Sequence, residues 1–354
     1  MKSDSPRTRA DGPGDDGTDA PKSATIYDVA RKAGVAASTV SRAFARPGRV
    51  NAVTAERIRG AAESLGYRAN PLARALPTGR TSIIAFTISD VANPFYAEII
   101  RGAQAAAAEA GFTMVLADGQ ESEVLEREAL ERVIPIVDGI VLATSRMSDA
   151  AIKVTARQKP MVVLNRSIPE VPSLTTDNQS GVRQVVEYLL GLGHRSVTYV
   201  AGPEASWADG ARWRALLEVG AKLKVSTRRI GPFAPTVHGG REAATHLMSP
   251  LPSAVLAYND QVAIGVINQL AEAGIVVPTA VSVIGFDDIF ASSLITPALT
   301  TVAAPLQQMG VIAVRNLLAV INGAQPRAGG ALVVPTHLIE RGSAGPARHR
   351  KDKE

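Results

Sequence analysis

The chain has 354 residues, a net charge of +5 and 46% hydrophobic residues, which is enough to build large buried cores in two or three domains. It contains no cysteine and only five histidines, which excludes disulfides and thiolate metal sites and argues against a structural zinc site. No apolar run approaches the roughly 20 residues that a membrane helix requires. We therefore expect a cytoplasmic protein with no membrane association, no metal and no cofactor.

The positive charge is concentrated near the N-terminus. Residues 1–22 are polar, lack the apolar core of a signal peptide, and are predicted to be a disordered tail. Residues 22–80 carry eleven Lys and Arg against three Asp and Glu, whereas residues 81–354 sum to −1. A basic head on a nearly neutral body indicates a polyanionic partner for the head, although basic surfaces also occur without such a partner.

Residues 23–69 show the pattern of short helices. Thr25 and Asp28 form the start of a helix, in a capping box with Asp in place of the usual Glu. Gly34 then permits a tight turn, because glycine adopts left-handed backbone angles without strain. A second helix is predicted over 38–44, directly after that turn.

The predicted second helix has two distinct faces. Val40 and Phe44 lie four residues apart and are expected to face the core. The opposite side carries short hydroxyls and one Arg that can reach the edges of bases, namely Ser38, Thr39 and Arg42. This helix therefore has the character of a recognition helix.

A third helix is predicted over 55–65, with Thr54 before its first residue and Gly66 after its last. Three short helices with a tight turn between the first two form a helix-turn-helix, which places its second helix in the major groove of DNA. A small helical bundle that binds protein is the alternative. The basic excess of the segment favours DNA.

Residues 70–80 are interpreted as a hinge helix and linker. Asn70 can cap a helix and Pro71 suits its first position. About two turns follow before Pro77, which disfavours a helical conformation at Leu76. So short a helix is unstable by itself in water, and we expect it to fold only against another molecule.

From residue 82 onward, strand-like apolar runs alternate with amphipathic stretches. The runs are Ser82–Ile88, Thr113–Ala117, Gly139–Leu142, Met161–Leu164, Ser196–Ala201, Ala254–Ala257 and Val281–Gly285. The amphipathic stretches are Pro94–Ala110, Val124–Ile134, Gly181–Leu192, Gly239–Met248, Gln261–Ala273 and Leu306–Ile321. Continuous apolar strands that alternate with helices predict parallel sheets covered on both faces.

Such a segment is long for one sheet, so residues 81–342 are predicted to form two doubly wound parallel-sheet subdomains. Residues 343–354 are predicted to be a polar tail. The fold class is thus α + α/β, with a helix-turn-helix head, a hinge helix and a two-lobed body. Polar residues at 93–96, 165–166 and 287 follow predicted strands, and we expect them to face a ligand cleft beyond the strand ends.

The sequence offers no catalytic motif. It has no cysteine nucleophile, no Gly-x-Ser-x-Gly elbow, no nucleotide-binding loop after a strand and no histidine pair with metal-ligand spacing. We therefore expect a protein that is not an enzyme. A binding protein that delivers solute to a transporter is the alternative to a regulator, but it predicts a secretion signal and no basic head.

The chain resembles the LacI/GalR family of bacterial transcription regulators, from about Thr25 to Gly342. In the head the matching motifs are Thr25-Ile26-Tyr27-Asp28-Val29-Ala30, Gly34-Val35, Ser38-Thr39-Val40-Ser41-Arg42, Leu65-Gly66-Tyr67, Asn70-Pro71-Leu72-Ala73-Arg74 and Thr78-Gly79-Arg80-Thr81. In the body they are Asn93-Pro94-Phe95-Tyr96, Asp138-Gly139-Ile140, Gly193-His194-Arg195, Ala201-Gly202-Pro203, Asn259-Asp260, Val283-Ile284-Gly285-Phe286-Asp287-Asp288 and Pro297-Ala298-Leu299-Thr300-Thr301.

The resemblance implies a sequence-specific repressor that binds a near-palindromic operator of double-stranded DNA as a homodimer. The implied DNA-binding residues are Thr25, Tyr27, Ser38, Thr39, Ser41, Arg42, Thr54, Asn70, Ala73 and Leu76. In this picture the hinge helix forms on the operator and inserts Leu76 into the minor groove as a wedge. Pro77 departs from the basic or polar residue that many relatives carry, and it removes a possible phosphate contact.

The resemblance also implies that operator affinity is controlled by a small molecule, a sugar or sugar derivative, bound between the two lobes. The implied effector-binding residues are Phe95, Ser145, Asn165, Arg166, Ser206, Arg212, Asn259 and Asp287. Arg, Asn and Asp side chains converging on a cleft suit a polyhydroxylated ligand, and Trp207 can stack on a sugar face. Taken alone, Arg212 can equally be a surface helix residue and Asp287 a loop cap.

Overall fold

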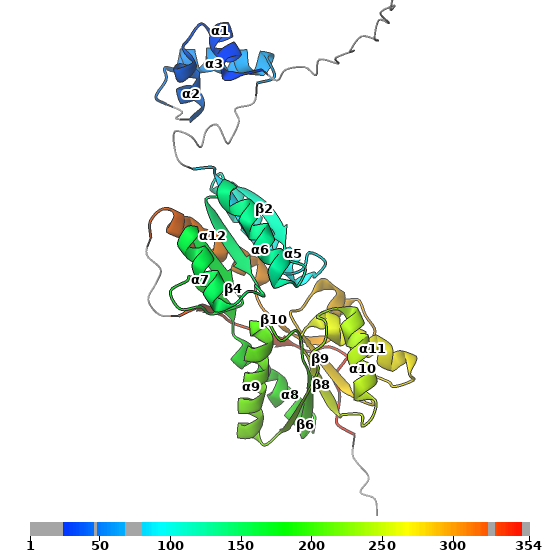
Figure 1. The fold of residues 1–354 in the computed structure, drawn as a ribbon. Coiled ribbons are helices and arrows are strands. Elements are labelled where there is room, and N and C mark those ends of the chain that lie inside the picture. Colours follow the sequence, from blue (N-terminus) through cyan, green and yellow to red (C-terminus); the bar gives the residue numbers. More distant parts are fainter. Residues whose placement is uncertain (1–23, 46–47, 68–79, 325–329, 349–354) are drawn as a thin grey trace, which may run out of the picture. The chain divides into compact units, whose positions relative to one another are not determined.

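The computed structural model describes residues 24–45, 48–67, 80–324 and 330–348, in two compact units (Figure 1). The first unit, Met1–Arg80, is called the head, and the second, Thr81–Glu354, the body. The predicted tail at 1–22 and the predicted hinge helix at 70–76 lie outside the described residues.

Within its described residues, the head contains three helices around a small core. They are α1 (Ile26–Ala33), α2 (Ala37–Ala45) and α3 (Ala52–Ser64). Each helix contributes one fully buried branched side chain, namely Val29, Val40 and Ile58. The core is small because only one face of each short amphipathic helix is apolar.

Local sequence signals set the ends of these helices. The Asp28 carboxylate accepts hydrogen bonds from the Thr25 backbone N–H at 2.9 Å and from its hydroxyl at 2.6 Å, at the start of α1. Gly34 adopts a φ of 62° in the tight turn between α1 and α2, as predicted. The prediction for α3 was wrong at its start, because Asn51 caps it by accepting from the Val53 N–H at 2.9 Å. Thr54 lies inside the first turn.

The described part of the body, residues 81–324 and 330–348, contains two six-stranded sheets. The first has the order β11-β5-β4-β3-β1-β2 and defines lobe 1; the second has the order β12-β10-β9-β8-β6-β7 and defines lobe 2. The strands of lobe 1 are β1 (Ile83–Ile88), β2 (Thr113–Asp118), β3 (Gly139–Ala143), β4 (Met161–Leu164), β5 (Ser173–Thr176) and β11 (Leu332–Val334). Those of lobe 2 are β6 (Ser196–Val200), β7 (Ser226–Ile230), β8 (Ala254–Ala257), β9 (Ser282–Phe286), β10 (Thr300–Ala303) and β12 (His337–Ile339).

Helices cover both faces of each sheet, as predicted for doubly wound sheets (Figure 1). In lobe 1, side chains of α5 (Phe95–Glu109) and α12 (Leu306–Ile321) share a core with one face of the strands, and those of α6 (Glu123–Val133) and α7 (Asp149–Gln158) share a core with the other. In lobe 2, α8 (Asn178–Gly191) and α9 (Trp207–Leu223) cover one face, and α10 (Val237–Leu247) and α11 (Asp260–Glu272) the other. Two short 3-10 helices span Ile134–Ile136 and Phe290–Ser293.

The chain passes between the lobes three times. It crosses after β5 into α8, after β10 into α12, and between β11 and β12. Each crossing is short, and two of them are tied together, because the Thr336 hydroxyl donates to the Asp177 carbonyl at 2.9 Å. Three short connections constrain how one lobe moves against the other.

The structure departs from the predicted fold in four details. Strand β12 pairs antiparallel with β10, so the second sheet is not wholly parallel. Strands β5, β7, β10, β11 and β12 were not predicted, and neither were helices α7 and α9. The body also continues past Gly342, the predicted boundary. Ser343 is fully buried, and its hydroxyl donates to the Val283 carbonyl at 2.6 Å.

Candidate functional site

The head presents a polar helix face opposite its core. On α2, Val40 is buried, whereas Ser38 and Arg42 are exposed and Thr39 and Ser41 half-buried. The Arg42 guanidinium lies along the helix and donates from Nε to the Ser38 carbonyl at 3.1 Å. This face has the composition expected of a recognition helix.

The other predicted DNA-binding residues are placed differently. Tyr27 is 69% exposed, while the Thr25 hydroxyl is engaged by Asp28. Thr54 lies half-buried in the first turn of α3, on the same unit as the recognition helix. The remaining three, Asn70, Ala73 and Leu76, lie outside the described residues.

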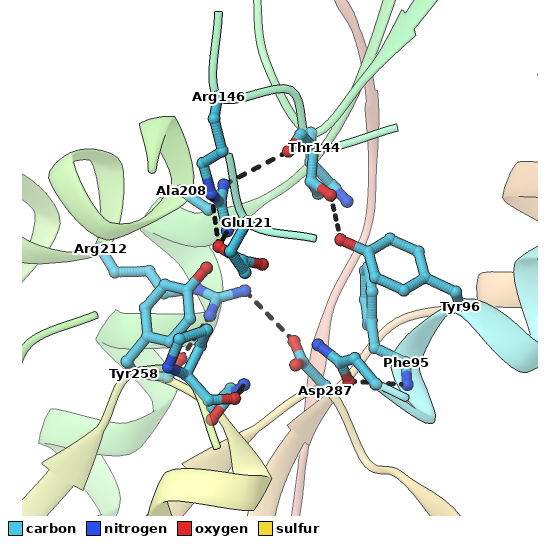
Figure 2. Close-up of a pocket in the computed structure, with 13 residues that line it drawn as sticks. Phe95, Tyr96, Glu121, Thr144, Arg146, Ala208, Arg212, Tyr258 and Asp287 are labelled. Carbon is cyan, nitrogen blue, oxygen red and sulfur yellow. Dashed lines mark hydrogen bonds and ion pairs between the residues drawn. The ribbon is translucent and has the colours of Figure 1, made fainter. Parts of the chain in front are cut away.

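A pocket lies between the two lobes of the body (Figure 2). It is lined by Asn93, Phe95, Tyr96, Glu121, Thr144, Arg146, Asn165, Ala208, Arg212, Pro235, Tyr258, Asn259 and Asp287. The lining comes from the segments that follow strands β1, β2, β3 and β4 of lobe 1 and β6, β7, β8 and β9 of lobe 2. This is the edge at which open parallel sheets bind ligands.

Backbone strain is concentrated around this pocket. Four lining residues have positive φ values, a backbone region that residues other than glycine rarely adopt. They are Glu121 at 56°, Thr144 at 53°, Asn165 at 55° and Asp287 at 117°. Each such residue costs on the order of 1–3 kcal/mol and persists where surrounding structure enforces it, which is typical of functional sites. Four of these strained residues therefore lie together in the lining of one cleft.

An ion-paired arginine dominates the lobe 2 side of the pocket. Arg212 Nη2 lies 3.3 Å from Asp287 Oδ1, its Nε donates to Asn178 Oδ1 at 3.0 Å, and its Nη1 donates to the Tyr258 carbonyl. The guanidinium carbon also lies 3.6 Å from the centre of the Phe286 ring, a cation–π contact. Every nitrogen of Arg212 is thus held in place.

Asp287 has a raised pKa and only one of its two carboxylate oxygens bonded to the described residues. Burial raises its pKa to about 7, although the neighbouring Arg212 opposes the shift. Only its Oδ1 accepts a hydrogen bond from the residues that the structure describes, so the other oxygen has no protein donor among them. A carboxylate oxygen beside a cavity is a strong acceptor for a ligand hydroxyl.

The loop that carries Asp287 is fixed from both sides. Asp260, at the start of α11, accepts from the Ile289 N–H at 2.9 Å and the Ser292 hydroxyl at 2.6 Å. Asp288 forms an ion pair of 2.7 Å with Arg341 on its other side. These contacts hold the strained backbone that points Asp287 at Arg212.

A second arginine and a hydroxyl network form the lobe 1 side. Arg146 binds Glu121 Oε2 through Nε and Nη2, each at 2.6 Å. Glu121 Oε1 accepts from the Ser89 hydroxyl at 2.7 Å, and the Tyr96 hydroxyl forms hydrogen bonds with Ser89 and Thr144. Burial raises the pKa of Tyr96, so its phenol keeps its proton.

Five of the eight predicted effector residues line the pocket, namely Phe95, Asn165, Arg212, Asn259 and Asp287. Ser145, Arg166 and Ser206 do not. Ser145 is buried and accepts from the Met147 N–H, while Arg166 turns away to an ion pair with Asp149 at 2.6 Å. Ser206 caps α9 and bonds the Tyr258 hydroxyl at 3.0 Å, behind the pocket wall. Trp207 is not among the lining residues.

Asn93 and Tyr96 also line the pocket, in the segment 93–96 that was expected to face the cleft, whereas four polar or aromatic lining residues were not predicted, namely Glu121, Thr144, Arg146 and Tyr258. One available signal was position, because Thr144, Arg146 and Tyr258 closely follow strands that were predicted. Among the described residues no group of three His, Asp or Glu is placed to hold a metal ion, and none of the described helices is long and apolar enough to cross a membrane.

Comparison with known proteins connects both sites to one family. The family pattern described as bacterial regulatory proteins, lacI family, matches residues 25–70, and a periplasmic binding protein-like domain matches residues 186–344. The HTH-type transcriptional repressor CytR of Escherichia coli (strain K12) is 32% identical over 328 residues, covering 90% of this chain and 96% of the relative. The HTH-type transcriptional regulator GalR of the same strain is 31% identical, covering 84% and 90%.

Solved structures agree in fold. A lac repressor dimer bound to operator and the anti-inducer ONPF aligns with a TM-score of 0.80 and 25% identity, covering 92% of this chain and all of that one. A LacI family regulator from Enterococcus faecalis V583 with bound ribose aligns with a TM-score of 0.68 and 27% identity, covering 75% of this chain and all of that one. The chain has the head and the two-lobed body of these proteins, and its alignment with CytR, at 32% identity, covers 90% of it. This chain therefore belongs to the lacI family of bacterial regulatory proteins.

Proposed function

We propose that this chain is a transcription repressor, not an enzyme, whose affinity for a DNA operator is set by a small polyhydroxylated effector bound between the lobes of the body. The observation that carries the proposal is the presence, in one lacI-family chain, of a basic helix-turn-helix head and a strained polar pocket at the strand ends of both lobes. Relatives named as repressors and a relative with bound ribose support it.

In the proposed complex, two heads of a homodimer contact two half-sites of a near-palindromic operator. Ser38, Thr39 and Arg42 on α2 read base edges, and Lys and Arg side chains of the head contact phosphates. The hinge residues 70–76 fold on the operator and Leu76 enters the minor groove. Because the operator is chromosomal, the cytoplasm is the proposed location.

The effector contacts Phe95, Asn165, Arg212, Asn259 and Asp287 in this proposal. The free oxygen of Asp287 accepts from a hydroxyl, and the two Asn amides donate and accept. The effector changes operator affinity only to the extent that it prefers one arrangement of the lobes. The three crossings are the segments through which that preference alters the spacing between the heads of a dimer.

The test begins with selection of an operator from random double-stranded DNA by the full chain. Fluorescence anisotropy then measures affinity for that operator at physiological salt. Arg42→Ala is expected to weaken binding by about 1–3 kcal/mol, the worth of a good base contact. Arg157→Ala, which removes an equal charge from an exposed position on α7 of the body, serves as the control and is expected to have no effect. Failure to select any sequence, or equal losses in the two variants, would contradict the operator-reading role.

A second experiment tests the effector with the same anisotropy assay. Uncharged sugars and nucleosides are added to the preformed complex, and Arg212→Ala is compared with wild type. At least one compound is expected to change operator affinity in wild type and to have no effect in Arg212→Ala. A response that survives unchanged in the variant would remove the pocket from the proposal.

A further inference from the structure

The pocket contains equal numbers of opposite charges. At pH 8, where Asp287 is ionised, four of its lining residues are charged: Arg146 and Arg212 are cations, and Glu121 and Asp287 are carboxylates. The arginines belong to different lobes, and each is paired with a carboxylate of its own lobe. The charges that a ligand meets therefore depend on whether either arginine is free to bind an anion.

Arg146 is not free. Two of its nitrogens lie 2.6 Å from Glu121 Oε2, and Nη1 donates to the Thr144 carbonyl at 3.3 Å. Its side chain is only 5% exposed, so little solvent weakens the ion pair. An anion that approached Arg146 would also approach the carboxylate of Glu121.

Arg212 is neutralised in the same way. All three of its nitrogens have partners, and the carboxylate of Asp287 faces the pocket beside it. Both side chains of this pair are less than a tenth exposed. In such a site an uncompensated negative charge on a ligand is costly, because few water molecules remain to solvate it.

The helices that begin beside the pocket direct some of their first N–H groups to the protein's own side chains. Helix N-termini bind phosphate through free backbone N–H groups. Here Asn93 Oδ1 accepts from the Phe95 N–H, Ser206 Oγ from the Asp209 N–H, and Asn259 Oδ1 from the Val262 N–H. A side chain of the protein thus occupies one backbone N–H in the first turn of each of α5, α9 and α11.

We infer that the effector is an uncharged polyhydroxy compound, and that Glu121 and Asp287 exclude its phosphorylated and other anionic counterparts. The inference rests on the proposed function and narrows it, because it names the class of effector. The same carboxylates that repel phosphate accept hydrogen bonds from hydroxyls, so one feature gives both affinity and selectivity.

The test measures ligand binding to the free full chain by thermal shift and calorimetry at pH 8, where Asp287 is ionised. The probes are inorganic phosphate and a panel of uncharged sugars and nucleosides, each beside its phosphate ester. Wild type is expected to bind an uncharged member and neither its ester nor inorganic phosphate. Glu121→Gln is expected to bind inorganic phosphate about tenfold to a hundredfold more tightly than wild type, because Arg146 loses its counter-charge.

Two further variants keep the test decisive. Glu123→Gln, at the half-buried first residue of α6, removes the same charge outside the pocket lining and is expected to leave phosphate binding unchanged. If Glu121→Gln does not fold, Asp287→Asn provides the same test in lobe 2, because it removes the counter-charge of Arg212. Phosphate binding by wild type in competition with a bound sugar, or no gain in either pocket variant, would overturn the inference. If no uncharged compound in the panel binds wild type, the result contradicts the proposed effector and not the exclusion of anions.

Discussion

The pKa of Asp287 makes a quantitative prediction about how effector affinity depends on pH. Burial raises this pKa to about 7, so below pH 7 the folded, ligand-free protein holds a proton on the carboxylate, and above pH 7 it does not. A hydroxyl of the proposed effector donates a hydrogen bond to the ionised carboxylate, which is also the form that pairs with Arg212. Protonation therefore competes with the effector.

The size of the effect follows from the fraction of competent protein. If only the ionised form binds, the apparent Kd is the intrinsic Kd divided by that fraction. With a pKa of about 7, roughly nine-tenths of the protein is competent at pH 8 and about one-tenth at pH 6. Affinity is therefore expected to fall about tenfold between pH 8 and pH 6, and to continue falling with a slope near tenfold per unit below that.

Calorimetry with the uncharged sugar that gives the largest thermal shift measures this dependence. Repeating it in buffers of different ionisation enthalpy counts the protons, and close to one is expected to be released on binding at pH 6. The control is Asp287→Asn, which binds more weakly and whose affinity is expected to be flat over the same range. A flat profile for wild type, or an equal slope in the variant, would refute the role assigned to Asp287.

Two predictions concern stability. Asn51→Ala is expected to destabilise the head by about 1 kcal/mol, because it removes the N-cap of α3, whereas Thr54→Ala is expected to cost less; hydrogen exchange of the head amides in the full chain measures both, and a larger loss for Thr54→Ala would reverse the assignment. Gly265→Ala would place a Cβ 2.1 Å from the Val237 carbonyl oxygen, so α10 and α11 must separate at a cost of about 1–3 kcal/mol or more in urea unfolding. Gly210→Ala, on α9 with nothing within 4 Å, is the matched control and is expected to be neutral or slightly stabilising; equal effects of the two glycine changes would contradict the packing argument.

Much of the fold could be predicted from the sequence because burial on both faces leaves a continuous apolar run. Strands β4 and β8 and helix α12 have the predicted bounds without change. Strand β7, with the sequence Ser-Thr-Arg-Arg-Ile at the sheet edge, was missed because most of its side chains are not buried. Strand β10 was missed because three of its four residues are Thr or Ala, although all four are buried.

For the candidate site, the sequence predicted some of the strand ends that form it but not every residue that lines it. The sequence predicted cleft residues after strands β1, β4 and β9, because parallel strands direct their C-terminal ends to one edge. It did not predict which residue of each loop would face the cavity, and the wrong choice of Ser145 between Thr144 and Arg146 is an example. That choice depends on the φ of 53° at Thr144 and on the buried Glu126, which accepts from the Arg146 N–H at 2.8 Å.

The sequence by itself determined the basic head, the helix-turn-helix and its capping at Thr25, and the alternation that gives two doubly wound lobes, because each of these depends on neighbours within a few residues. Only the tertiary structure decided that Arg146 pairs with Glu121 and Arg212 with Asp287. These partners are separated by 25 and 75 residues in the chain. Local periodicity has no information about such a pairing, since packed sheets and strained loops bring the charges together.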